Sequence, residues 1–340
     1  MRKVVRWSLT VVGVFLLSLL LVGMTGWGVL AIYYSDLESS ALRVAIAGIF
    51  GLLGLIGSIG LASRRWRRRV LIVFTVLFVI LVAWWNTIKA SNDRSWQPEV
   101  AVLPYATIEG DRVTVHNIRN FDYRSETDFT PAYYNKTFDL RQLDSVDLIA
   151  VYWMGPEIAH TFLSFGFGGK DHLAVSIETR KEQGEGYSTI KGFFRQYELY
   201  YVVADERDVI RVRTNYRKDP PEDVYLFHLH GPSENGRRLF LEYMREINSL
   251  KEQPEFYNTL TTNCTTTIWL NARVNPGHVP FSWKVLLSGH VPEYLYEAGV
   301  LDTRLPFPEL MTRSLINARA KAADQDPDFS RRIREGLPGY

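Results

Sequence analysis

The sequence predicts an α+β domain with an antiparallel sheet, preceded by three transmembrane helices. Three observations carry this prediction. The N-terminal part holds three long apolar runs. The next part contains short segments in which apolar and polar residues alternate between turn signals, as in antiparallel strands. Apolar residues at helical spacing then indicate amphipathic helices. With 340 residues, the chain is long enough for a membrane region and one good-sized domain.

The apolar runs cover residues 4–32, 41–61 and 70–85. A helix that spans a membrane needs about 20 mostly apolar residues. The first two runs meet this length, and the third reaches it when residues 86–88 are included. The first run is longer than the apolar core of a cleaved signal peptide, and two more spans follow, so we expect it to remain in the protein. Residues 1–90 are therefore predicted to form a membrane domain.

Lysine and arginine residues define the predicted orientation. They precede the first span and fill the loop at residues 64–69, whereas the loop between the first two spans carries Asp36 and Glu38. Because basic loops stay in the cytoplasm, the chain after Trp85 is expected outside it. We therefore predict a multi-pass inner-membrane protein with residues 91–310 in the periplasm. The net charge of +2 gives no reason to expect a nucleic-acid partner.

The soluble part begins with a predicted hairpin in residues 100–123, whose turn lies at 109–111. Residues 120–136 are rich in aromatic side chains but have no clear period, so we expect an irregular segment. The two glycines at 168–169 mark a tight turn between two further strands. The other predicted strands are 137–139, 146–154, 160–167, 171–180, 198–204, 209–214 and 224–230.

Several helices are predicted toward the C-terminus. Residues 233–250 have apolar side chains at helical spacing. Short helices are expected at 283–287 and 292–298, and a charged helix at 311–334, which we place in a separate tail of residues 311–340. The charged residues 205–208 are expected to form a solvated turn.

The only cysteine, Cys264, lies in a stretch that has the features of a helix start. Thr261, Thr262 and Asn263 are N-cap residues, and an apolar run follows. In the first turn of a helix, the macrodipole and the unpaired N–H groups favour a thiolate, so Cys264 is a possible nucleophile. The alternative is that Cys264 is a small buried apolar residue. A single cysteine excludes an intramolecular disulfide and a C-x-x-C motif.

A catalytic cysteine needs a base within hydrogen-bond reach. Of the seven histidines, His160 is the best placed, at the mouth of a strand after a Gly-Pro turn. Glu178, on the adjacent strand and on the same side as Ser176, is the expected acidic member. Arg180 is a possible charge partner of Glu178 or a clamp for substrate; alternatively, Glu178 and Arg180 form an ordinary ion pair. Asn263, Ser176 and Arg180 are the predicted substrate or oxyanion contacts.

Two histidines on one strand, His228 and His230, have a spacing that can bind zinc. No third ligand is identifiable in the sequence. We therefore predict neither a metal site nor a cofactor.

Three sequence runs resemble the DUF4105 family, which is the periplasmic domain named after the lipoprotein N-acyltransferase of the Bacteroides type. The resemblance extends over about residues 100–302 and rests on a His motif, an S-I-E-x-R motif and an N-C motif. The three runs are VDLIAVYWMGPEIAHTFLSFGF, SIETRKEQGEGYSTIKGFFRQYELYYVVADERDVIRVR and EFYNTLTTNCTTTIW.

The resemblance implies a permuted papain-like fold of the NlpC/P60 type, in which the His strand precedes the Cys helix. It further implies that Cys264 is the nucleophile, His160 the base and Glu178 the third member. The expected function is thiol-dependent acyl transfer from a membrane lipid or lipoprotein. Hydrolysis and a non-catalytic envelope scaffold are the alternatives. This chain departs from the family in having its apolar spans at the N-terminus, whereas family members usually carry a longer C-terminal membrane region. The resemblance therefore predicts the catalytic domain but not the family's substrate.

Overall fold

The computed structural model describes residues 2–340. The chain divides into two compact units. One unit contains the chain up to Ala90 together with Ser188–Gln196, and the other contains Ser91–Tyr187 and Tyr197–Tyr340.

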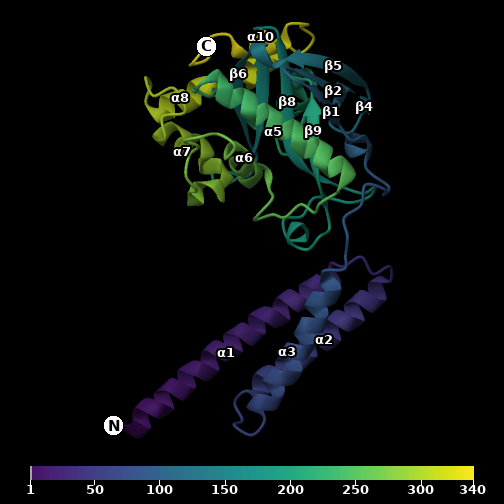
Figure 1. Ribbon diagram of the computed structural model, residues 1–340, viewed down its shortest axis with the longest axis vertical. Helices are drawn as coiled ribbons and strands as arrows, with labels where there is room; N and C mark the ends of the chain where they lie inside the picture. Colours follow the sequence, from purple (N-terminus) through teal and green to yellow (C-terminus); the bar gives the residue numbers. More distant parts are fainter. Residues whose placement is uncertain (1) are drawn as a thin grey trace. The chain divides into compact units, whose positions relative to one another are not determined.

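The first unit is built from α1 (Arg2–Tyr33), α2 (Ser40–Gly60) and α3 (Arg67–Trp85) (Figure 1). All three are long and apolar enough to cross a membrane, as the sequence predicts. The helices pack closely where glycine removes the side chain: a Cβ at Gly54 would collide with Thr25 of α1. Small residues at such positions allow membrane helices to approach one another.

The segment Ser188–Gln196 belongs to this first unit although it lies between two strands in the sequence. Its Phe194 ring packs on Tyr34 and Trp85, with centroid distances of 5.7 and 6.2 Å. Arg195 donates hydrogen bonds to the carbonyl oxygens of Trp85, at 2.7 Å, and Ile88, at 3.1 Å. A cation at the C-terminal end of a helix is favourable because the helix dipole is negative there.

The second unit is organised by one sheet with the order β1-β2-β9-β8-β7-β6-β10, and β5 pairs with β2. Its strand pairs are antiparallel except for a single parallel pair between β2 and β9. The turn between β7 and β8 contains Gly168 and Gly169 with φ of +59° and +66°, the conformation that a two-residue hairpin turn requires. The strands of the sheet are β1 (Tyr105–Glu109), β2 (Arg112–Arg119), β5 (Tyr133–Asp139), β6 (Leu143–Tyr152), β7 (Ala159–Phe167), β8 (Asp171–Arg180), β9 (Glu198–Ala204) and β10 (Asp223–His228), and a separate pair is formed by β3 (Asp122–Tyr123) and β4 (Phe129–Thr130).

Each face of the sheet is covered by a different set of helices. Figure 1 shows α5 (Ser233–Glu252) lying across one face, where it packs with α6 (Cys264–Ala272) over the odd-numbered side chains of β7 and β8. The opposite face carries the even-numbered side chains and packs against residues of α4 (Glu206–Arg211), α9 (Asn317–Ala322) and α10 (Phe329–Arg334). This division follows from the alternation of side chains along a strand.

The strand predicted at 209–214 is wrong, because this segment is helical. α4 continues into a π-helical turn, Val212–Tyr216. Asp205 begins α4 as its N-cap, since its side chain accepts a hydrogen bond from the backbone N–H of Arg207. The prediction that residues 205–208 form a solvated turn is also wrong: Glu206 and Asp208 are fully buried.

The continuous helix predicted at 311–334 is wrong as well. The segment consists of α8 (Phe307–Ser314), α9 and α10. Leu315 interrupts the helix with an extended backbone that bridges to Tyr225 of β10. Ile316, Phe329 and Ile333 are fully buried in the core of this unit. One more α-helix is α7 (Val291–Glu297). The remaining short helices are 3-10 turns, at Pro98–Val100, Leu140–Gln142, Lys191–Phe193, Trp283–Val285 and Ser288–His290.

Candidate active site around Cys264

Cys264 is the first residue of α6, as the sequence predicts. The carboxamide oxygen of Asn263 accepts hydrogen bonds from the N–H groups of Thr265, at 2.9 Å, and Thr266, at 2.8 Å. The Thr266 hydroxyl accepts in turn from the N–H of Asn263 at 3.0 Å, which completes a capping box. Among the described residues, no acceptor is found for the backbone N–H of Cys264. The cap thus leaves one free donor beside the thiol.

Strands β7 and β8 separate where this helix begins. Their pairing starts at Leu163 opposite Val175 and continues only toward the hairpin turn. Before Leu163, β7 pairs with β6 alone, and beyond Val175, β8 pairs with β9 alone. The sheet therefore opens between these two strands, and α6 contacts both of them.

The opening brings together three polar side chains that are predicted site residues, namely His160, Ser176 and Glu178. His160 Nε2 lies 2.7 Å from the Ser176 hydroxyl and 3.0 Å from Glu178 Oε1. Ser176 donates to the same carboxylate oxygen at 2.8 Å. Ser176 is fully buried, whereas the side chain of Glu178 is 27% exposed. A carboxylate and a hydroxyl thus fix one nitrogen of the imidazole.

The imidazole of His160 and the thiol of Cys264 lie close enough for each group to shift the pKa of the other. The backbone N–H of Thr161 also contributes to lowering the pKa of this thiol. Thr161 has no partner on β8, so this side of its backbone is open toward α6. The hydroxyl of Thr265 lies 3.6 Å from Sγ. The thiol from one face of the sheet therefore meets the imidazole from the other face.

The electrostatics of this pair favour a thiolate and an imidazolium. Burial alone would raise the pKa of Cys264, but the charge and hydrogen bond of His160 lower it to about 7. Burial alone would lower the pKa of His160, but the Glu178 carboxylate and Cys264 raise it to about 9. Burial works to raise the pKa of Glu178, yet His160 and Arg213 hold it well below its usual range.

Two further residues of the site were missed in the sequence. Arg213 Nη2 lies 3.0 Å from Glu178 Oε1, and the same guanidinium lies 3.4 Å from Glu222. It was missed because its segment was interpreted as a strand. The buried phenol of Tyr257 has a pKa raised by burial and by the neighbouring Cys264. No spacing signal in the sequence marks Tyr257 as part of the site.

Two of the predicted substrate contacts have other partners. The carboxamide of Asn263 is engaged at both ends, because its Nδ2 donates to the carbonyl oxygen of Thr259 at 2.8 Å. Arg180 is buried, stacks over Trp96 at 4.3 Å, and donates to the carbonyl oxygens of Val100 and Ala101, each at 2.9 Å. The ion pair suggested between Glu178 and Arg180 is replaced by the pair with Arg213.

A second polar cluster lies on the same face of the sheet, around Arg334 of α10. Arg334 Nη2 lies 2.7 Å from Asp147 and 2.6 Å from Glu206, and both carboxylates are fully buried. His228 Nδ1 lies 3.1 Å from Asp147, and the Tyr340 hydroxyl is hydrogen-bonded to it. The imidazole of His228, which the sequence pairs with His230 at a spacing suited to zinc, is thus bonded to the Asp147 carboxylate. In the described part of the chain, no group of three metal-binding side chains is found.

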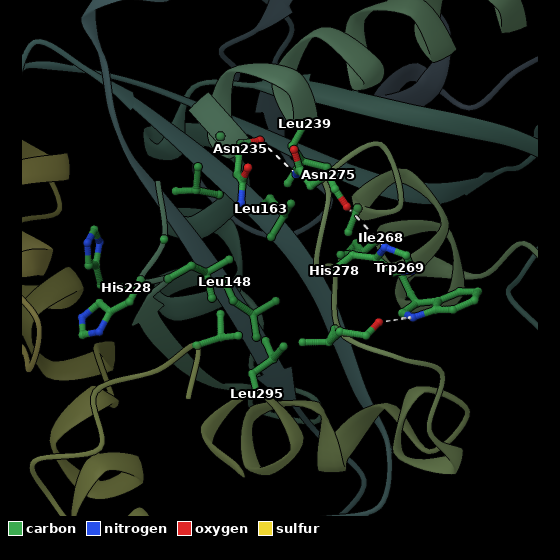
Figure 2. A pocket seen from close by; sticks show the side chains of 18 of the residues that line it. Leu148, Leu163, His228, Asn235, Leu239, Ile268, Trp269, Asn275, His278 and Leu295 are labelled. Atoms are coloured by element: carbon green, nitrogen blue, oxygen red, sulfur yellow. Dashed lines mark hydrogen bonds between the residues drawn. The ribbon is translucent and has the colours of Figure 1, made fainter. Parts of the chain in front are cut away.

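A cavity of about 640 Å³ lies on the α6 side of the sheet (Figure 2). β6 and β7 contribute one wall, and α5, α6 and α7 contribute the others. Most of its lining is aliphatic or aromatic, and Thr161 and Thr265 also belong to it.

Part of this chain matches a known family model. Neither the curated proteins nor the solved structures contain a match to this chain. The matched residues include His160, Glu178, Arg213 and Cys264. Residues 129–289 match the family model described as the Lnb N-terminal periplasmic domain, and together with the three apolar helices this match indicates a membrane-anchored periplasmic protein.

Proposed function

We propose that this protein is a thiol acyltransferase of the inner membrane, with three membrane spans and a catalytic domain in the periplasm. In this proposal, Cys264 accepts an acyl group from a lipid or lipoprotein and passes it to an amine. The observation that carries the proposal is that Cys264 begins α6 next to His160, whose imidazole lies 3.0 Å from the carboxylate of Glu178. A nucleophile, a base and an orienting group in contact are the arrangement that covalent acyl transfer requires.

The first half-reaction forms a thioester. His160 holds the thiol proton, and the thiolate of Cys264 attacks the ester carbonyl to form a C–S bond. The resulting oxyanion accepts a hydrogen bond from the free backbone N–H of Cys264. The C–O bond of the ester then breaks, and the leaving alkoxide takes the proton from His160.

The second half-reaction restores the enzyme. An amine attacks the thioester carbonyl and gives its proton to His160 as the C–N bond forms. The C–S bond breaks, and Cys264 leaves as a thiolate beside the imidazolium. The low pKa of Cys264 supports this step, because a thiolate of low basicity is a good leaving group.

Glu178, Ser176 and Arg213 position the base in this proposal. Glu178 and Ser176 occupy Nε2 of His160, which leaves Nδ1 for the thiol. Arg213 keeps Glu178 ionised, and the carboxylate in turn stabilises the imidazolium. The order of elements, with the His160 strand before the Cys264 helix and an antiparallel sheet between them, supports a permuted papain-like fold.

Intact mass spectrometry of the full-length protein in detergent tests the proposal. The protein is incubated with bacterial phospholipid, and the wild type is compared with Cys264→Ser and His160→Ala. We expect a fatty-acyl adduct that hydroxylamine removes, on the wild type alone. Because Cys264 is the only cysteine, any thioester is assigned to it without peptide mapping.

Iodoacetamide labelling separates the remaining outcomes. If iodoacetamide labels Cys264 but no acyl adduct forms, the thiol is reactive but does not accept an acyl group from phospholipid. This result would favour a hydrolase that acts on another carbonyl. A folded protein whose Cys264 is inert to both reagents would contradict the thiol mechanism and favour the scaffold alternative.

A further inference from the structure

The cavity beside α6 offers an apolar surface to a ligand. Figure 2 shows Leu148, Leu163 and Leu295 around it, with Ile268 and Trp269 contributed by α6. The indole N–H of Trp269 already donates to the carbonyl oxygen of Val279 at 3.0 Å, so this side chain has no unsatisfied donor to offer. A volume of about 640 Å³ falls within the range of about 300 to 1,000 Å³ for small-molecule sites.

Two threonines are shared by the cavity and the Cys264 site. Thr161 follows His160 on β7 and lines the cavity, and its backbone N–H contributes to lowering the pKa of the Cys264 thiol. Thr265 follows Cys264 on α6 and also lines the cavity, with its hydroxyl 3.6 Å from Sγ. The two hydroxyl oxygens are 3.3 Å apart. The cavity therefore begins one residue away from both proposed catalytic groups.

We infer that this cavity binds the hydrocarbon chain of the acyl group that Cys264 carries. The inference rests on the proposed function, because it needs an acyl group on Cys264. A group joined to Sγ is next to Thr161 and Thr265, and the apolar lining beyond them favours methylene groups over water. Charged and imidazole groups, including Asp144, His228 and His230, also belong to the lining. Figure 2 shows His228 at the margin away from Trp269.

Acylation of Cys264 by esters of different chain length tests the inference. The full-length protein in detergent is mixed with p-nitrophenyl acetate or p-nitrophenyl octanoate, and the initial release of p-nitrophenolate is recorded. Intact mass confirms the adduct. Because each buried methylene favours binding, we expect the wild type to react at least about tenfold faster with octanoate than with acetate.

Two variants fill the cavity, and one control does not. Ala272→Phe and Val300→Phe each add a ring to a partly buried residue of the lining. Ala298→Phe is the matched control, because Ala298 is exposed at the end of α7 and outside the lining. We expect each filling variant to lower the octanoate-to-acetate ratio about tenfold or more, and Ala298→Phe to keep the wild-type ratio within about twofold. Circular dichroism identifies a variant that fails to fold, in which case the other one decides.

Two results would overturn the inference. Equal rates for acetate and octanoate in the wild type would show that no site for the chain contributes to acylation. If the filling variants fold and keep the wild-type octanoate-to-acetate ratio, the hydrocarbon chain binds outside this cavity. In both cases Cys264 still forms an acyl-enzyme, so the proposed function survives. No reaction with either ester would instead overturn the proposed function and this inference with it.

Discussion

Arg334 and Arg213 each contact two carboxylates, but the clusters around them differ in how completely their polar groups are satisfied. Arg334 lies within 2.7 Å of both Asp147 and Glu206, which are fully buried. Arg213 contacts Glu178 and Glu222 at the longer distances of 3.0 and 3.4 Å. Its Nε has no hydrogen-bond partner in the described part of the chain.

The carboxylates of the two clusters also differ in the further hydrogen bonds that they accept. Asp147 also accepts from the Tyr340 hydroxyl, and Glu206 accepts from Ser164. These contacts join β6, β7, α4 and α10, so the Arg334 cluster holds the domain together. Around Glu178, the hydrogen bonds lead to His160 and then to a thiol that is only partly buried. The closed Arg334 cluster stabilises the fold, whereas the open Glu178 cluster leaves its charge beside His160 and Cys264, as the proposed function requires.

The largest expected effect is on folding, from Arg334→Met. This substitution leaves Asp147 and Glu206 buried without their cation, and breaking a buried pair costs about 3–5 kcal/mol. Urea denaturation of the full-length protein, followed by tryptophan fluorescence, measures the free energy of unfolding. Arg332→Met is the control, because Arg332 pairs with the exposed Glu335 and such pairs contribute about 0–1 kcal/mol. If Arg334→Met lowers the free energy of unfolding by less than about 1 kcal/mol, the cluster does not stabilise the fold as expected.

The same cluster gives a pH dependence with a defined sign. Burial would raise the pKa of Glu206, but Arg334 lowers it to about 2 from the ordinary 4.5. A carboxyl with a lowered pKa stabilises the folded state above its ordinary pKa. This stabilisation is therefore expected to be complete above pH 4.5 and to fall as the pH decreases toward 2. Arg334→Met is expected to weaken this dependence.

An intermediate effect is expected on thiol reactivity, from Glu178→Gln. Removing the carboxylate lowers the pKa of His160, which weakens the imidazolium that stabilises the thiolate. At about pH 6.5, the rate of iodoacetamide labelling should fall about tenfold or more if the pKa of Cys264 returns to its usual 8.5. The free energy of unfolding should change much less than in Arg334→Met. An unchanged labelling profile would show that Glu178 does not act on the thiol.

The smallest expected effect comes from Ser176→Ala. His160 keeps its direct contact with Glu178 at 3.0 Å, so the pH profile of labelling should stay close to that of the wild type. The loss of two buried hydrogen bonds should lower stability by about 1–2 kcal/mol. A drop in labelling as large as that of Glu178→Gln would mean that the hydroxyl, rather than the carboxylate, orients the imidazole.

The sequence was most informative where chemistry and local pattern coincide. Cys264 follows a run of N-cap residues, and His160 and Glu178 lie on segments with clear strand patterns. These signals are local, so both the elements and the side-chain directions could be predicted. The three apolar helices were predictable for the same reason, because length and hydropathy define them.

The sequence was misleading where tertiary contacts decide the structure. The segment around Arg213 has a strand-like composition, but the cap at Asp205 and the burial of Glu206 against Arg334 make it helical. Charged residues usually lie at the surface, and they are buried only when an oppositely charged partner is present. Here that partner, Arg334, is distant in the sequence. The opening between β7 and β8 also depends on pairing register, which residue patterns do not specify.

The distance along the chain between the two halves of the site has a consequence for biogenesis. Thr161 and Thr265, the neighbours of His160 and Cys264, are 104 residues apart in sequence. An unfolded chain in transit therefore carries a cysteine with an ordinary pKa, which is mostly a thiol at neutral pH. The pKa of Cys264 falls to about 7 only when β7 and α6 have assembled. In the proposed function, folding is therefore the step that activates Cys264 as a nucleophile.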